Sequence, residues 1–166
     1  MLNADLKQQL KQLLELMEGD VEFVASLGSD DKSKELKELL DEIADMSARI
    51  TVTENDLKRT PSFSVNRPGE ETGVTFAGIP LGHEFNSLVL AILQVSGRAP
   101  KEKQSVIDQI KGLEGPFHFE TFVSLTCQKC PDVVQALNLM SVINPNITHT
   151  MIDGAVFRLS LIHISE

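Results

Sequence analysis

The sequence predicts an α/β fold in which helices cover a β-sheet and a first unit is followed by a partial repeat of itself. Three observations lead to this prediction. Segments with helical spacing alternate with short strand-like runs, and several residue pairs recur about one hundred residues apart. The two cysteines of the chain stand where a strand of the second unit gives way to a helix.

The expected elements follow from the spacing of apolar residues and from runs rich in β-branched or aromatic residues. Helices are expected at residues 3–17, 31–47, 83–96, 101–111 and 130–143. Strands are expected at residues 21–27, 50–53, 60–65, 73–77, 117–125 and 147–152. Residues 83–96 are apolar on nearly every side, which predicts a helix buried on more than one face. The segment Gly97-Arg98-Ala99-Pro100 marks the boundary between the two units.

The repeat depends on three matched pairs of dipeptides. These are Glu18-Gly19 with Glu114-Gly115, Ser26-Leu27 with Ser124-Leu125, and Ile50-Thr51 with Ile147-Thr148. The alignment places Ser29 opposite Cys127 and Lys32 opposite Cys130. The first unit is therefore expected to have the architecture without the thiols and to serve as a scaffold or a docking surface.

Length and charge limit the possible functions. The chain has 166 residues, a length that suffices for one ordinary domain or two small ones. Its net charge is −9. An acidic surface argues against binding nucleic acids or anionic lipids. No apolar run is long enough to span a bilayer, and the first residues lack the features of a signal peptide. We therefore expect a cytoplasmic protein.

The chemistry of the chain is expected in Cys127-Gln128-Lys129-Cys130, which follows a predicted strand and opens a predicted helix. Unpaired N–H groups at a helix start favour a thiolate at Cys127. Cys130 lies one turn further on, where it can close a disulfide, and Pro131 is tolerated in the first turn. In a reducing compartment such a pair is more typical of redox chemistry or metal binding than of a structural disulfide.

Two other interpretations of the cysteine pair remain open. One CxxC supplies half of a zinc site, and His118 and His149, on predicted strands, lack ligand spacing and are interpreted as ordinary, partly buried histidines. The pair could also be inert. The chain has neither a GxGxxG fingerprint nor a P-loop, so we expect it to bind no flavin or nicotinamide cofactor itself.

Two segments resemble a known family. Gly82-His83-Glu84-Phe85-Asn86-Ser87-Leu88-Val89-Leu90 and the stretch from Cys127-Gln128-Lys129-Cys130 through Pro131-Asp132-Val133-Val134 to Met140 are similar to the N-terminal domain of the AhpF family of alkyl hydroperoxide reductases, which are bacterial flavoproteins. The resemblance runs from near Met1 to about Phe157. It implies two tandem thioredoxin-like folds, at residues 1–98 without redox cysteines and at residues 99–157 with the CxxC motif, the second truncated at its C-terminal end.

The resemblance also implies a function. In this family the dithiol takes electrons from a thioredoxin reductase-like body that carries FAD and uses NADH, and passes them to a peroxiredoxin that reduces hydroperoxides. Cys127 matches the exposed nucleophile and Cys130 the resolving thiol. Glu84 matches an acid near the dithiol that could move protons, although a carboxylate in the first turn of a helix is also favoured by the dipole alone. Thr60-Pro61 matches a proline, often cis, that precedes a strand in such folds.

The chain departs from the family at its end. Residues 158–166 do not match the family's continuation and resemble read-through into a sequencing adapter, so we interpret this tail as an artefact. The resemblance implies a flavoprotein domain downstream of this sequence. It also implies a homodimer for the full-length protein. A truncated second fold is expected to expose the edge of the strand at 147–152. The alternatives to a redox module are a non-catalytic adaptor and a zinc-stabilised interaction domain.

Overall fold

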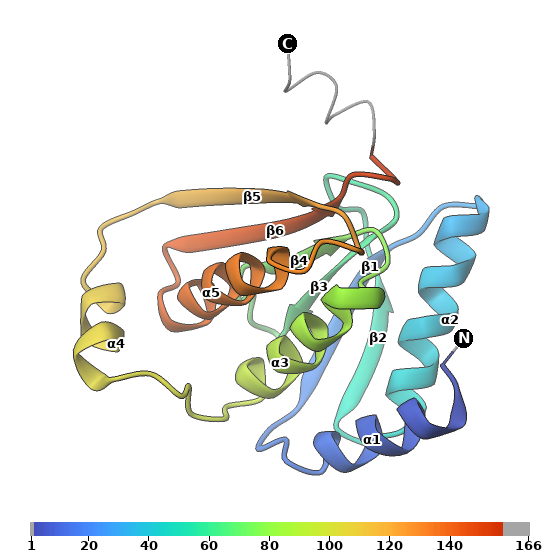
Figure 1. Ribbon diagram of the computed structural model, residues 1–166, viewed down its shortest axis with the longest axis horizontal. Coiled ribbons are helices and arrows are strands. Elements are labelled where there is room, and N and C mark those ends of the chain that lie inside the picture. Colours follow the sequence, from blue (N-terminus) through green and yellow to red (C-terminus); the bar gives the residue numbers. More distant parts are fainter. Residues whose placement is uncertain (1, 158–166) are drawn as a thin grey trace.

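The computed structural model describes residues 2–157, so the tail at residues 158–166 lies outside the described residues. Its helices are α1 (Ala4–Leu14), α2 (Asp31–Asp45), the 3₁₀ helix η1 (Gly82–Glu84), α3 (Phe85–Val95), α4 (Gln104–Lys111) and α5 (Cys130–Ile143). Its strands are β1 (Val21–Ser26), β2 (Ile50–Glu54), β3 (Ser62–Asn66), β4 (Val74–Ala77), β5 (Phe117–Val123) and β6 (Ile147–Asp153). Figure 1 shows α3 and α5 side by side over one face of the sheet.

Every helix and strand expected from the sequence is present, and the differences lie at the boundaries. The strand expected from Thr60 begins at Ser62, after a cis Thr60-Pro61 peptide bond. The helix expected at residues 83–96 opens with a 3₁₀ turn, because η1 precedes α3. Capping explains two sharp helix starts: Asn3 accepts a hydrogen bond from the Leu6 N–H and Asp30 accepts one from the Ser33 N–H.

The strands form one sheet in the order β2-β1-β3-β4-β6-β5. Each half of the chain contributes a parallel pair joined by a helix: β1 with β2 across α2, and β5 with β6 across α5. The antiparallel strands β3 and β4 complete the first half. β4 then pairs in parallel with β6, so the two halves share a single continuous sheet.

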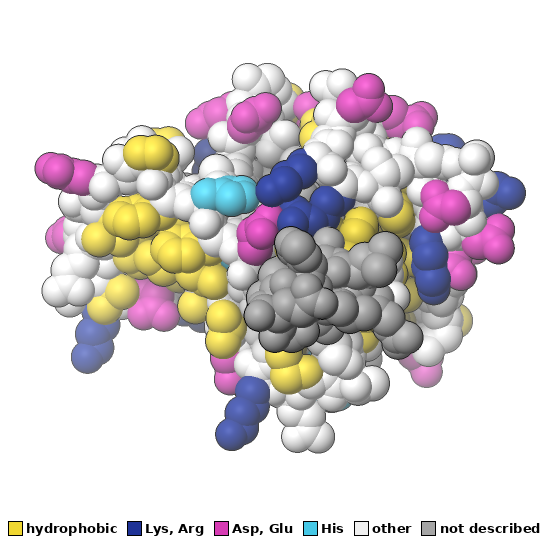
Figure 2. Space-filling model, turned by 90° about the horizontal axis from the view of Figure 1, so that it is seen from above, with side chains coloured by type: hydrophobic (Ala, Val, Ile, Leu, Met, Phe, Trp, Pro, Cys, Tyr) yellow, Lys and Arg dark blue, Asp and Glu magenta, His cyan; other side chains and the backbone are white. Residues whose placement is uncertain are grey.

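The expectation that the strand at 147–152 would have an exposed edge is wrong. β6 is an interior strand, paired with β4 on one side and with β5 on the other. The outermost strand on this side is β5, and its Phe117 side chain is 40% exposed. In Figure 2, which looks from above, hydrophobic side chains gather at the end of the molecule where α4 and β5 lie.

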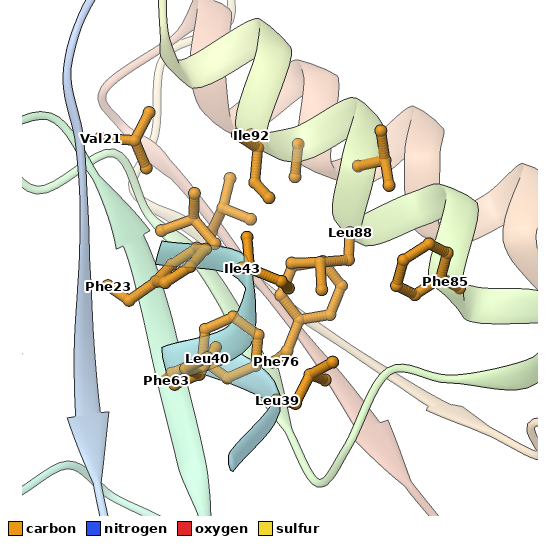
Figure 3. Packing of buried hydrophobic residues seen from close by; sticks show 14 of the residues in the cluster. Val21, Phe23, Leu39, Leu40, Ile43, Phe63, Phe76, Phe85, Leu88 and Ile92 are labelled. Atoms are coloured by element: carbon orange, nitrogen blue, oxygen red, sulfur yellow. The ribbon is translucent and has the colours of Figure 1, made fainter. Parts of the chain in front are cut away.

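The core lies between the sheet and helices α2 and α3. Phe23, Phe63 and Phe76 form its centre, with ring centroids 5.5 Å apart between the first two and 5.4 Å apart between the last two. Figure 3 shows Leu40 and Ile43 of α2 and Leu88 and Ile92 of α3 around these rings. As expected from its apolar surface, α3 is buried on more than one face. Within residues 2–157, no helix combines the length and the apolar character needed to cross a membrane.

The repeat is visible in the buried positions of α2 and α5, the helices that join the parallel strands of each half. Buried positions of α2 recur in α5 at an offset of 98 residues: Leu36 with Val134, Leu40 with Asn138, and Ile43 with Ser141. The same offset places Ser29 opposite Cys127 and Lys32 opposite Cys130, as the sequence alignment predicts. Two of the three matched positions are polar in α5, and one of them, Asn138, hydrogen-bonds to His149 of β6, whereas the Ser141 hydroxyl bonds within α5.

Candidate functional site

The cysteine pair lies where β5 passes into α5. β5 ends at Val123, a turn follows in which the Cys127 N–H bonds to the Ser124 carbonyl at 3.0 Å, and α5 begins at Cys130. Pro131 occupies the first turn, where its missing N–H leaves no hydrogen bond unmade. The expected placement of the motif, after a strand and at the opening of a helix, is confirmed.

Cys127 and Cys130 form a disulfide, with their Cα atoms 5.5 Å apart. The Cys130 N–H donates a hydrogen bond to Cys127 Sγ at 3.2 Å. The N-terminus of α5 has no side-chain cap, since Lys129 makes no capping hydrogen bond. The sulfur therefore receives both a donor and the positive end of the helix dipole, and each of these favours a thiolate on Cys127 after reduction. Cys130 packs against the hydrophobic core.

In the first half, the start of α2 corresponds to the start of α5, and a side-chain cap holds it. Asp30 caps α2 through the Ser33 N–H at 3.3 Å and also accepts a hydrogen bond from Ser33 Oγ at 2.6 Å. These bonds hold the pKa of Asp30 below its ordinary value. Ser33 Oγ in turn accepts the Gly28 N–H at 2.9 Å. A charged cap with a hydroxyl partner thus occupies the place that the disulfide takes in the second half.

Through η1, the first half directly contacts the loop at residues 124–129, which carries Cys127. The His83 N–H donates to the Leu125 carbonyl at 3.0 Å, two residues before Cys127. Gly82 has a φ of 59°, and a Cβ atom there would lie 2.8 Å from the same carbonyl oxygen. Glycine is therefore required both by the backbone conformation and by the close approach of the loop.

Glu84, the last residue of η1, is fully buried. Its Oε1 accepts a hydrogen bond from Ser87 Oγ at 2.8 Å, and Ser87 Oγ accepts one from Gln135 Nε2 of α5 at 3.1 Å. Burial raises the pKa of Glu84, an effect that the Ser87 hydroxyl and the neighbouring His83 partly oppose. The structure therefore links Glu84 to the helix that begins at Cys130.

Ser87 and Gln135 were missed by sequence reasoning. Each is an ordinary polar residue on a helix, and only the packing of α3 against α5 brings the two together. The one available signal was a serine three residues after Glu84, the spacing of neighbours on a helix face.

The two strand histidines lie in different environments. His149 is fully buried and hydrogen-bonded, so its interpretation as partly buried is wrong in degree. The His118 side chain is 55% exposed and lies 3.8 Å from Glu120 Oε2. Within the part of the chain that the structure describes, no three His, Cys, Asp or Glu side chains gather in a way that could hold a metal ion.

Comparison with known proteins places this arrangement in a family. No protein-family model matches the chain. The alkyl hydroperoxide reductase AhpF of Staphylococcus epidermidis is 94% identical over 158 residues, which are 95% of this chain and 31% of that protein. The crystal structure of the NTD_N/C domain of the alkylhydroperoxide reductase AhpF from Enterococcus faecalis is 32% identical, with a TM-score of 0.89 over 96% of this chain and 83% of that one. The chain belongs to the AhpF family of alkyl hydroperoxide reductases.

Its place within the AhpF family is the N-terminal region, and it spans 31% of the length of the Staphylococcus epidermidis relative. A protein disulfide oxidoreductase from Aeropyrum pernix aligns over 93% of this chain with a TM-score of 0.80 and 20% identity, a likeness that shows the fold alone. The predicted fold class, an α/β protein of tandem thioredoxin-like type, is confirmed.

Proposed function

We propose that this chain is a thiol–disulfide exchange module that carries electrons from a flavoprotein body to a peroxiredoxin. The observation that carries the proposal is the Cys127–Cys130 disulfide at the N-terminus of α5, with the Cys130 N–H donated to Cys127 Sγ. A sulfur held by a helix N-terminus is a good leaving group during reduction and a good nucleophile afterwards. Family membership supports the same function.

The cycle consists of two disulfide exchanges. The reduced Cys127 thiolate attacks a disulfide of the peroxiredoxin, forms a mixed disulfide with one partner sulfur and releases the other as a thiolate that takes up a proton. The Cys130 thiol then loses its proton and attacks Cys127 Sγ, which restores the disulfide and releases the second partner thiol. Two electrons leave the module in each cycle together with the proton of Cys130. The first partner thiolate takes its proton from the surroundings, to which Cys127 gave its own proton when it became a thiolate.

Glu84 is proposed to move protons in these steps. A buried carboxyl group with a raised pKa keeps its proton to a higher pH than an exposed one, and the proposal is that Glu84 exchanges this proton with the dithiol. The alternative is that Glu84 serves only to start the helix, and the experiments below separate the two.

The proposal assigns the cofactors and partners outside this chain. FAD and NADH belong to the downstream flavoprotein domain of the relatives, and the electron acceptor is the peroxiredoxin component of alkyl hydroperoxide reductase. We propose residues 1–98 as the unit without redox cysteines and residues 99–157 as the start of the unit that carries them, a division supported by the repeated βαβ order. We also propose a cytoplasmic location and a homodimer for the full-length protein.

The test is a trapping experiment. Cys130→Ser is expected to capture an oxidised peroxiredoxin in a covalent complex joined through Cys127, because the thiol that would release the mixed disulfide is missing. Cys127→Ser is the matched control and is expected to form little complex. Non-reducing gel electrophoresis followed by peptide mapping gives the result. A complex joined through Cys130, or equal trapping by both variants, would reject the assigned roles.

The same preparations test the alternatives. A pair that dithiothreitol reduces stoichiometrically, with a measurable midpoint potential, supports the exchange module. A folded protein whose pair does not respond to dithiothreitol would support a non-catalytic adaptor. Zinc that copurifies in stoichiometric amount would support a zinc-stabilised domain.

A further inference from the structure

A chain of hydrogen bonds crosses from the first half of the molecule to α5, the helix that begins at Cys130. Gln135 Nε2 of α5 donates to Ser87 Oγ at 3.1 Å, and Ser87 Oγ donates to Glu84 Oε1 at 2.8 Å. Glu84 and Ser87 are both fully buried. Gln135 lies five residues after Cys130 on the same helix. The chain therefore joins the carboxyl group to the element that begins with the resolving cysteine.

The direction of these bonds is set by the capacity of a hydroxyl group. A serine hydroxyl has one proton to donate and lone pairs that accept. Because the Gln135 amide donates to Ser87 Oγ, the Ser87 proton points to the carboxyl group of Glu84. Removing the amide frees the hydroxyl to rotate, and removing the hydroxyl takes away the hydrogen bond that it donates to Oε1.

Apart from the Ser87 hydroxyl, few polar groups among the described residues act on the Glu84 carboxyl group. Among the described residues Glu84 Oε2 is buried without a hydrogen-bond partner. His83, its neighbour on η1, acts on the carboxyl group electrostatically and lowers its pKa. From the second half, Gln135 reaches the group through Ser87, and the Leu125 carbonyl fixes the η1 backbone through the His83 N–H. The orientation of the acid therefore depends on Ser87, and that of Ser87 on Gln135.

We propose that Ser87 and Gln135 are positioning residues, which aim the Glu84 carboxyl group and tie it to the helix that carries the dithiol. The inference rests on the proposed role of Glu84 in proton transfer. Neither residue is expected to touch a substrate or a reacting sulfur. Their effect reaches the chemistry through the orientation and the proton affinity of Glu84.

The test compares Ser87→Ala and Gln135→Ala with the unmodified chain. Ser141→Ala is the matched control, because Ser141 is a buried serine of α5 whose hydroxyl donates to the Leu137 carbonyl. The first measurement is the titration of the Glu84 carboxyl carbon by NMR on ¹³C-labelled protein, which reports the acid without any assay of activity. The second is the rate at which dithiothreitol reduces the disulfide across pH.

The Glu84 titration midpoint is expected to rise most in Ser87→Ala, less in Gln135→Ala and not at all in Ser141→Ala, because the Ser87 hydrogen bond lowers the pKa of this acid. The pH profile of the reduction rate should shift in the same order. For Ser87→Ala the rate at neutral pH should fall about fivefold, a factor that corresponds to the usual net free energy of one hydrogen bond. Ser87→Thr keeps the hydroxyl and should restore both readouts.

Two failures are distinguishable. If Glu84→Gln has the same reduction profile as the unmodified chain, the role of Glu84 is overturned and the inference falls with it. If Glu84→Gln alters the profile but the Ser87 and Gln135 variants leave the titration midpoint unchanged, the inference alone is overturned. Gln135 is only partly buried, so its variant keeps the test valid if Ser87→Ala does not fold.

Discussion

His149 is a buried imidazole with both ring nitrogens in hydrogen bonds. Nδ1 lies 2.7 Å from Asn138 Oδ1 of α5, and Nε2 lies 2.8 Å from Thr121 Oγ1 of β5. An asparagine oxygen can only accept, so Nδ1 carries the proton and Nε2 accepts from the threonine hydroxyl. The neutral imidazole thus connects α5 with both strands of the second half. A second ring proton would turn Nε2 into a donor, so the Thr121 hydroxyl would have to rotate and accept.

We expect this residue to make the protein sensitive to acid. Burial, with a minor contribution from His118, lowers the pKa of His149 from 6.5 to about 4. The folded pKa is below the unfolded one, so the unfolded chain takes up the proton first. The stabilisation is present above pH 6.5 and is lost as the pH falls towards 4, a difference of about 3 kcal/mol.

The measurement is urea unfolding followed by far-ultraviolet circular dichroism at several pH values, since the chain has no Trp and no Tyr. His149→Gln should lower the stability at neutral pH and remove this component of the pH dependence. His118→Gln, which changes an exposed ring, is the control and should keep most of it, because His118 contributes less than burial to the lowered pKa of His149. A pH dependence that is the same in His149→Gln and in the unmodified chain would contradict the prediction.

At the scale of elements, η1 contacts and positions the loop at residues 124–129, which leads to the disulfide. Gly82 and His83 both meet the Leu125 carbonyl, one by close approach and one through a hydrogen bond. Glu84 completes the same turn with its buried carboxyl group. A short 3₁₀ turn of the first half therefore sets both the loop that leads to Cys127 and the acid linked to α5.

Gly82→Ala tests this contact. A side chain at a φ of 59° costs about 1 kcal/mol. The Cβ atom would also lie 2.8 Å from the Leu125 oxygen, and such overpacking adds about 1–3 kcal/mol. We expect the variant to unfold at lower urea concentration and its disulfide to react with dithiothreitol at an altered rate, because the loop before Cys127 must move.

Gly69→Ala is the matched control for this prediction. Gly69 has a φ of 76°, and no atom lies within 4 Å of the Cβ position. Its variant should lose only the backbone contribution of about 1 kcal/mol and keep the reaction rate of the unmodified chain. Equal losses of stability and equal rates in the two variants would show that the contact with Leu125 does not matter.

The same elements show how far sequence reasoning reaches. Periodicity predicts each helix and strand, because both patterns are local, and the thiol chemistry of Cys127 and Cys130 marks the site without any structure. The pairing of β4 with β6 has no local signal, since the partners are distant in the sequence and the pairing uses backbone groups. The bond from Gln135 to Ser87 depends on that same assembly and was missed for the same reason.

At the scale of the whole molecule, the continuous sheet makes the two halves depend on each other. β4 and β6 exchange backbone hydrogen bonds, α3 packs against α5, and Gln135 bonds to Ser87 across the boundary. The core cluster also includes Val134 and Met151 of the second half together with Leu40 of the first. These contacts join the two halves into one folded unit. A defect in one half should therefore destabilise the other.

Leu40→Ala tests this coupling. Leu40 lies in α2 of the first half and is a fully buried member of the core cluster labelled in Figure 3, so its truncation is expected to cost about 2–5 kcal/mol. If the halves unfold together, hydrogen exchange of the β6 amides should accelerate by the same free energy as that of the β1 amides. Leu13→Ala, at a leucine that is 39% exposed, is the control and should change both strands little. Faster exchange in β1 with unchanged exchange in β6 would mean that the halves open separately and that the shared sheet does not couple them.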